Sequence, residues 1–162
     1  MATSLFMKIE SIKGLSSDAN HEGWIELTSM ARSGRNNNRM GDSSNSKLTT
    51  RTAQLDPFVV SKESDITSPS LQDACHKSTS LGKVIIQSCF IDGGQLKPFV
   101  TYELEDCIVN SYDEQYVSEH SSGMETYTLV YNKLVHTVES MDAKAPGKRV
   151  ASHDLRSNKS GS

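Results

Sequence analysis

The stretch FVTYELEDCIV, residues 99–109, shows the clearest structural pattern in this chain. Its apolar residues Val100, Tyr102 and Leu104 alternate with polar ones. Alternation with a period of two is typical of a β-strand that buries one face and exposes the other. The pattern therefore predicts a half-buried strand here.

The same alternation recurs along most of the 162 residues and predicts a mainly β fold. Apolar residues make up only 35% of the chain, which is low for a monomeric globular domain, so we expect subunit contacts to complete its burial. The length suits a single domain. The predicted strands are Leu5–Ile12, Gly23–Ser33, Leu48–Val60, Lys83–Asp92, Phe99–Val109 and Tyr127–Val138.

Three local features indicate how these strands connect. Asp92-Gly93-Gly94 predicts a tight hairpin, because glycine readily adopts the positive φ that such turns need. Pro57 lacks an amide donor, so its strand is expected to lie at a sheet edge or to bend there. The alternation changes phase in Tyr127–Val138, which predicts a bulge near Asn132 and Lys133. Bulges let a sheet curve, so we predict a small antiparallel β-barrel.

One helix is predicted in ITSPSLQDACHKSTSLG, residues 66–82. Ser68 is the expected N-cap, Pro69 suits the first helical position, and Leu81-Gly82 is the expected end. Leu71, Ala74 and Cys75 form an apolar stripe that we expect to pack on the barrel.

Two segments look like loops and one like a tail. Residues 34–46, GRNNNRMGDSSNS, form a long polar loop between the second and third strands, and residues 113–123 form another. We assign residues 1–142 to the barrel domain and 143–162 to a C-terminal tail. Within the tail, Val150 and Leu155 are available to dock a short strand.

Charges are segregated although the net charge is only −3. The charged residues between positions 32 and 51 are basic except for Asp42, whereas residues 98–132 carry acids and no Lys or Arg. Two interpretations are open: both segments are solvated surfaces, or they are complementary patches that join identical copies. The acidic interface candidates are Glu103, Glu105, Asp106, Asp113 and Glu114.

Nothing in the sequence predicts catalysis, a cofactor or a metal site. The motifs GxSxG, HExxH, GxGxxG and the Walker loop are absent, and the histidines never stand at ligand spacing. Glu103 and Glu105 share a strand face, but such acids are commonly just exposed, and His136 is expected to be a packed strand residue. The three cysteines lie far apart and are expected to be buried, reduced thiols. We therefore expect no enzyme activity.

Membrane insertion and nucleic-acid binding are not expected either. No stretch has the roughly 18 consecutive apolar residues of a membrane span, and the start has no secretory signal pattern. The arginine-containing loop has no aromatic residues for stacking on bases, and the overall charge is negative.

In order, spacing and coverage, five blocks of the sequence resemble the haemolysin-coregulated protein (Hcp) family of bacterial type VI secretion systems. The resemblance as a whole runs from the first strand to the tail and covers about nine tenths of the chain. The blocks are FMKIESIKGLSSD (residues 6–18), HEGWIEL (21–27), DITSPSLQDAC (65–75), FVTYELEDCIVNSY (99–112) and TYTLVYNKL (126–134).

The resemblance implies a structural protein without enzymatic activity. Hexameric rings of it would stack into the inner tube of a contractile machine, and its lumen would carry effector proteins. The implied partners are further copies of the chain, effectors, a spike protein of the VgrG type and the contractile sheath. The protein would assemble in the bacterial cytoplasm and leave without a signal peptide. An alternative is an Hcp-like adaptor or chaperone that serves one effector and never polymerises.

The resemblance also assigns roles to residues. Ser29, Ala31 and Ser33 would face the lumen, and the loop 34–46 would reach the adjacent ring. This chain departs from the family at Met30 and Arg32, where relatives often carry aromatic residues, and in the loop, where Asn and Arg replace a glycine-rich stretch. The ring-stacking candidates are Gly34, Arg35, Asn36, Asn37, Asn38, Arg39, Met40 and Asp42.

Overall fold

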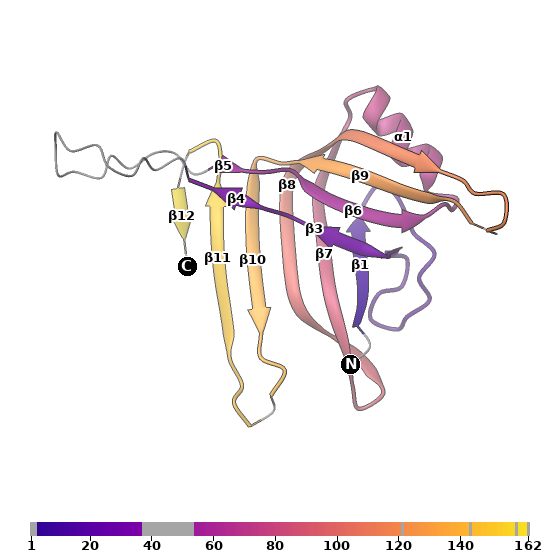
Figure 1. Ribbon diagram of the computed structural model, residues 1–162. Coiled ribbons are helices and arrows are strands. Elements are labelled where there is room, and N and C mark those ends of the chain that lie inside the picture. The colour runs from indigo at the N-terminus through magenta and orange to yellow at the C-terminus, as the bar shows by residue number, and fades with distance from the viewer. Residues whose placement is uncertain (1–2, 37–53, 121, 143, 158, 162) are drawn as a thin grey trace, which may run out of the picture.

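The fold is mainly β, with antiparallel strand pairs and one helix, as the sequence predicts (Figure 1). The computed structural model describes residues 3–36, 54–120, 122–142, 144–157 and 159–161. The strands are β1 (Thr3–Ile9), β2 (Ile25–Leu27), β3 (Ser29–Ala31), β4 (Gly34–Arg35), β5 (Gln54–Leu55), β6 (Phe58–Glu63), β7 (Ser80–Asp92), β8 (Gln95–Gln115), β9 (Met124–Val130), β10 (Lys133–Glu139), β11 (Lys148–Asp154) and β12 (Lys159–Gly161), and the helix is α1 (Ser68–His76).

The strand pairs lead most of the way around a barrel. From β1 they run through β7, β8, β9 and β6 to β3, and β2 pairs with β1 on its other side. Only Thr28 separates β2 from β3, and its amide donates a hydrogen bond of 2.8 Å to the Ser61 carbonyl on β6. The two ends of this path, β2 and β3, are thus joined by the chain itself and not by a strand pair.

The long strand β8 joins the barrel to a flat extension. It pairs with β7 over much of its length, with β10 through residues 100–105 and with β9 through residues 108–115. Strands β11 and β12 then continue outward from β10 (Figure 1). The stretch 99–109 forms the centre of β8, where Leu104, Cys107 and Val109 are buried in the core. Its alternation therefore predicts the strand correctly.

The predicted hairpin is confirmed. Asp92 pairs with Gln95, and the two residues between them, Gly93 and Gly94, have φ values of 58° and 79°. Both central residues thus adopt the left-handed conformation of a two-residue hairpin turn, which explains the two glycines.

Three strand predictions need correction. Gly23–Ser33 is not one strand, because Thr28 separates β2, which pairs with β1, from β3, which pairs with β6. Tyr127–Val138 is not one bulged strand: β9 ends at Val130 and β10 begins at Lys133, which pairs with Glu105 on β8. The next residue of β8, Asp106, has a φ of 51°. Leu48–Val60 is not one strand either, because Asp56 and Pro57 separate β5 from β6. Strand β6 also pairs on both sides, so it is not an edge strand. Proline breaks the strand because it cannot donate to a ladder.

The helix lies where it is expected, but its ends differ. Thr67 is the N-cap and makes no side-chain capping bond, and the C-cap is Lys77, so the helix stops before Leu81-Gly82. The Ser68 hydroxyl instead bonds to buried charged groups. Leu71 and Ala74 are buried and Cys75 packs against the core, which confirms the apolar stripe.

The segment treated as a tail carries regular structure. Strand β11 pairs with β10 along its whole length, and β12 pairs with the end of β11. Leu155 packs against the core, whereas Val150 is 40% exposed. The division of domains at residue 142 stays a prediction.

Candidate assembly surfaces

Strand β3 presents small side chains on its exposed face. Ser29, Ala31 and Ser33, the predicted lumen residues, are all exposed, whereas Met30 between them packs against the core. This alternation follows from the pleat of the strand. Ser29 and Ala31 share one accessible face of β3, and Ser33 is exposed just beyond the end of the strand. Their role in lining a lumen stays a prediction.

Arg32 ties this strand to the middle of the sheet. Its guanidinium lies 4.9 Å from the ring centroid of Tyr102 on β8, and its Nη2 lies 3.2 Å from His136 Nδ1 on β10. His136 also stacks on Tyr102, so it is a packed strand residue as expected. Burial, together with the neighbouring Arg32 cation, lowers the pKa of His136. The neutral imidazole can accept a hydrogen bond from Arg32, whereas the imidazolium cannot.

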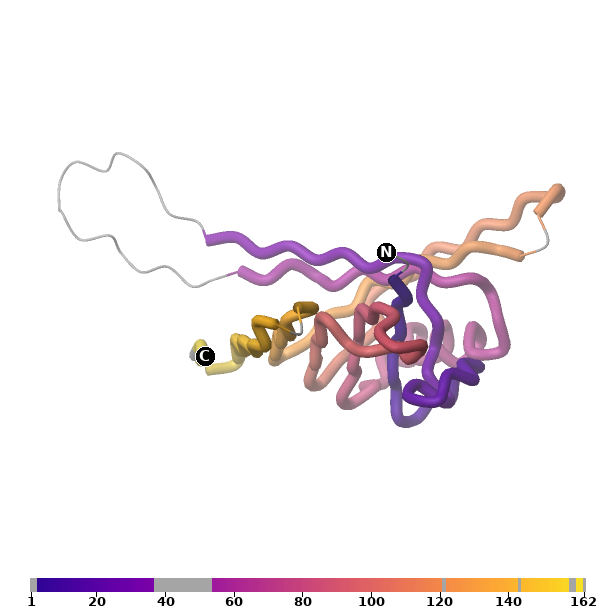
Figure 2. Tube along the Cα trace, turned by 90° about the horizontal axis from the view of Figure 1, so that it is seen from below, coloured from indigo at the N-terminus to yellow at the C-terminus, as the bar shows by residue number. Residues whose placement is uncertain are grey.

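Beyond β3 and β6 the chain continues as the short ribbon of β4 and β5. Figure 2 shows these segments projecting from one side of the molecule, opposite the paired ends of β8 and β9. At the base of the ribbon Arg35 Nη2 lies 3.6 Å from Asp56 Oδ1, and Ser33 Oγ donates to Asp56 Oδ2 at 2.7 Å. Of the stacking candidates, Gly34, Arg35 and Asn36 are exposed. Asn37, Asn38, Arg39, Met40 and Asp42 lie outside the described residues.

The acidic candidates all lie on β8 but form two groups. Glu103 and Asp106 already have ion-pair partners, Lys83 at 3.0 Å and Arg156 at 3.0 Å. Asp113 and Glu114 lie near the projecting end of β8 and are exposed. Their nearest members, Asp106 and Asp113, are seven residues apart, which is about 24 Å at a rise of about 3.4 Å per strand residue. They do not make one continuous patch.

A buried ion pair connects the helix to the barrel, and sequence reasoning missed it. Lys62 Nζ on β6 lies 2.9 Å from Glu125 Oε2 on β9, and both side chains are fully buried. Ser68 Oγ donates to Glu125 Oε2 at 2.7 Å, while Gln72 and Tyr127 donate to Oε1. Glu125 belongs to the acidic run 98–132, yet it contributes nothing to surface charge. Lys62 lies on the same face of its strand as the apolar residues Phe58 and Val60. A charged residue on that inward face is the feature of the sequence that could have revealed the buried pair.

A second buried polar cluster forms around His21. Its Nδ1 lies 2.7 Å from Asp18 Oδ2, and its Nε2 lies 2.9 Å from Gln87 Oε1 and 3.4 Å from Cys89 Sγ. The arrangement, in which Asp18 contacts His21 and His21 contacts Cys89, resembles a catalytic thiol with a histidine base and a carboxylate that orients the base. However, Cys89 is fully buried, and burial raises its pKa to about 11, so the thiol stays protonated.

Burial also keeps a second thiol protonated. Burial raises the pKa of Cys107 to about 12, and all three cysteines are free. Cys75 is half-buried on the helix. Across the described ranges, no group of His, Cys, Asp and Glu is arranged to hold a metal ion.

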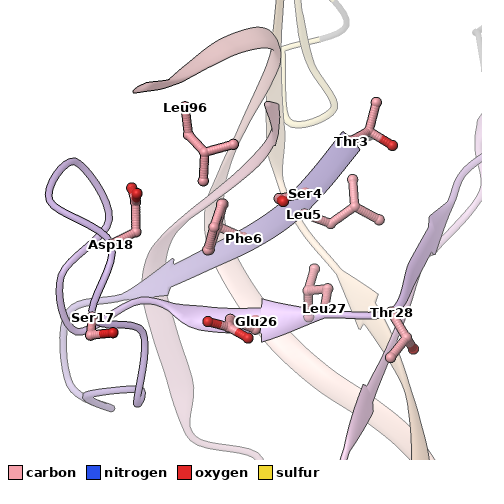
Figure 3. A pocket seen from close by; sticks show the side chains of 10 residues that line it. All are labelled: Thr3, Ser4, Leu5, Phe6, Ser17, Asp18, Glu26, Leu27, Thr28 and Leu96. Atoms are coloured by element: carbon pink, nitrogen blue, oxygen red, sulfur yellow. The ribbon is translucent and has the colours of Figure 1, made fainter. Parts of the chain in front are cut away.

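A groove of about 520 Å³ lies at the start of β1. Figure 3 shows Leu5 and Leu27 along the strands, Leu96 from the β7–β8 hairpin, and the carboxylates Asp18 and Glu26. No Lys or Arg lines it. The groove thus combines apolar surface with negative charge.

Comparisons with known proteins agree with this architecture. The family model described as "Type VI secretion system effector, Hcp" matches residues 6–138. No curated protein matches the sequence. In the part of the chain that the structure describes, no helix has the length and apolar character to cross a bilayer.

Solved structures share the fold. A structure described as a type six secretion system protein has a TM-score of 0.90 and 23% identity, covering 99% of this chain and 100% of that chain. Hcp1 from Salmonella typhimurium has a TM-score of 0.77 and 20% identity, with 99% of each chain covered. A type VI secretion system effector from Yersinia pestis has a TM-score of 0.74 and 21% identity, covering 93% of this chain and 98% of that chain.

The identities to these structures are low, so they support the fold, whereas the family model supports the assignment. That model covers most of the chain, from β1 to the end of β10. The chain therefore belongs to the Hcp family of type VI secretion system proteins.

Proposed function

We propose that this protein forms hexameric rings that stack into the inner tube of a type VI secretion system. The observation that carries the proposal is the exposed face of β3, where Ser29, Ala31 and Ser33 leave a smooth surface of small side chains. In a ring of barrels, such a face can line a channel without filling it. Membership of the Hcp family supports the type VI secretion system as the machine in which the tube would work.

The mechanism is mechanical, not chemical. Sheath contraction would push the stacked rings outward with a VgrG-type spike at the tip, and effectors would travel in the lumen. The tube would assemble in the bacterial cytoplasm and be delivered outside or into a target cell. The buried Lys62–Glu125 pair between β6 and β9 suits a load-bearing subunit, because close-packed protein interiors resist deformation.

Stacking would rest on contacts that are individually weak. The ribbon of β4 and β5 projects from one side of the molecule and carries Arg35 (Figure 2). Arg35, together with Arg39, would engage acids of the next ring or subunit. Exposed ion pairs are worth about 0–1 kcal/mol each, but a ring repeats every contact six times. Such an interface would hold successive rings in a fixed register and still allow the tube to disassemble.

Negative-stain electron microscopy of the purified protein, with light scattering over a wide concentration range, tests the proposal. Six-fold rings and stacked tubes are the expected result. A chain that stays monomeric or dimeric at every concentration, and binds one effector at fixed stoichiometry, would replace the tube with the adaptor alternative.

A further inference from the structure

The outer edge of β11, which is partly unpaired, and the groove at the start of β1 lie at opposite ends of one sheet. The path of paired strands runs β12, β11, β10, β8, β7, β1 and β2. Figure 1 shows β11 and β12 on one side of the molecule and β1 on the other. A contact between two different patches on opposite sides of a subunit is heterologous, and it closes into a ring when the rotation allows.

The first patch, which we name the β11 edge, is residues 148–151. All four are exposed, although strand residues in a covered sheet would bury at least one face. Strand β12 pairs only with Ser152–Asp154, so among the described strands the outer edge of residues 148–151 has no partner. An unpaired strand edge is a template for contact with another chain.

The chemistry of the β11 edge is apolar and basic. Val150 is 40% exposed. Lys148 lies 3.5 Å from Glu139, but Arg149 makes no ion pair with any described residue. A free guanidinium beside exposed apolar surface favours a partner with carboxylates and apolar side chains.

The second patch, the groove at the start of β1, has this complementary chemistry. Its apolar walls come from Leu5, Leu27 and Leu96. Its carboxylates are Asp18, which accepts from His21, and Glu26, which is exposed and makes no ion pair with a described residue. The volume of about 520 Å³ admits a few side chains of a strand.

We propose that the β11 edge of one subunit docks in the groove at the start of β1 of the next subunit, with Arg149 facing Glu26. This inference rests on the proposed ring and names the surfaces that would build it. It also explains why the extension of β11 and β12 lies outside the barrel: the extension would reach the neighbouring copy.

Charge exchange tests the contact. We expect Arg149→Glu and Glu26→Arg each to weaken ring assembly, raising the concentration for half-assembly by about tenfold or more. The double variant Arg149→Glu with Glu26→Arg restores the pair in reverse, so it should restore rings. Light scattering and negative-stain images report the assembly, and circular dichroism checks that each variant is folded. Lys77→Glu on the helix and Glu22→Arg, outside the groove, are matched controls that should leave rings intact.

The outcomes separate the two ideas. A wild-type chain without rings under all conditions would overturn the proposed function and this inference with it. Wild-type rings that persist in both single variants, or that the double variant fails to restore, would overturn the inference alone. If an effector occupies the groove instead, rings persist in the Glu26→Arg variant while the effector is lost, which also overturns it.

Discussion

Lys62 Nζ and Glu125 Oε2 lie 2.9 Å apart, and neither side chain is exposed. Asp65 Oδ1 also lies 3.0 Å from the lysine, and the Ser68 hydroxyl bridges both groups. The network links β6, β9 and the start of α1, so the helix is held by charge as well as by its apolar stripe.

Removing one partner of this pair should destabilise the fold strongly. Lys62→Met leaves the Glu125 carboxylate buried without its cation, which costs about 3–5 kcal/mol. Urea unfolding measures the change in the free energy of unfolding. The double variant Lys62→Met with Glu125→Leu should recover much of the loss, because the fully buried carboxylate is then gone and only the partly exposed Asp65 lacks its cation. Lys77→Met is the control: it removes an exposed pair with Asp73 and should cost less than about 1 kcal/mol. A small effect of Lys62→Met would show that water reaches the site.

Protonation of His136 should weaken the folded state in mild acid. Its pKa lies below the ordinary 6.5 in the folded protein, so the unfolded chain binds the proton more readily. Stability is therefore complete above about pH 6.5 and falls as the pH drops through that value, until the folded His136 is itself protonated. Unfolding of wild type and His136→Gln between pH 5 and pH 8 measures this. The wild type should lose more stability on acidification than the variant, and parallel pH profiles would contradict the prediction.

The stability of the hairpin between β7 and β8 should depend on the backbone conformation of Gly94 and not on the space around it. Gly94 has a φ of 79°, and a Cβ added there meets no atom within 4 Å. Gly94→Val should therefore cost about 1–2 kcal/mol, the price of a left-handed conformation for a branched residue. Gly93→Asn should cost less, since asparagine tolerates this region. Equal losses in urea unfolding for both variants would argue against the conformational explanation.

Reversing the arginines of the long loop should separate stacking from ring formation. Arg35→Glu with Arg39→Glu should leave rings intact but abolish tubes in negative-stain images. Since Arg35 also pairs with Asp56 within the chain, Arg35→Gln is the control that removes this exposed pair without reversing the charge. Tubes of normal length from the doubly reversed protein would reject the role of the loop.

A bulky side chain on β3 should block the channel without harming the fold. Ala31 is exposed, so Ala31→Trp should change the free energy of unfolding by no more than about 0.5 kcal/mol. Rings should persist, while effectors no longer co-purify, because six indoles narrow the lumen. Ala145→Trp, at an exposed turn, is the matched control. Unchanged effector recovery from Ala31→Trp would place the lumen elsewhere.

Local patterns in the sequence were enough for several elements of the fold. The alternation in residues 99–109 predicts the centre of β8, Asp92-Gly93-Gly94 predicts the hairpin, and the spacing of Leu71 and Ala74 predicts the helix. These features depend on the pleat of a strand, the φ range of glycine and the pitch of a helix. Each acts between residues a few positions apart, so each is visible in the chain itself.

The assembly candidates could be predicted only in part. Ser29, Ala31 and Ser33 alternate with residues that turn inward, so their shared face follows from the strand period. The acids 103–114 appear as one cluster in the sequence, but along β8 they form two groups, and Glu103 and Asp106 pair within the chain. Whether an acid is free depends on which cation a distant strand brings near it.

Interactions between neighbouring residues in the chain cannot specify the register between distant strands. Lys62 finds Glu125 only because β6 and β9 align them, and Arg32 meets His136 only because the barrel brings β3 close to β8 and β10. The order of the strands also leaves β11 and the groove at the start of β1 at opposite ends of the sheet. Local backbone preferences act within a turn or a strand, whereas burial, ion pairing and free edges arise only when the whole sheet is assembled.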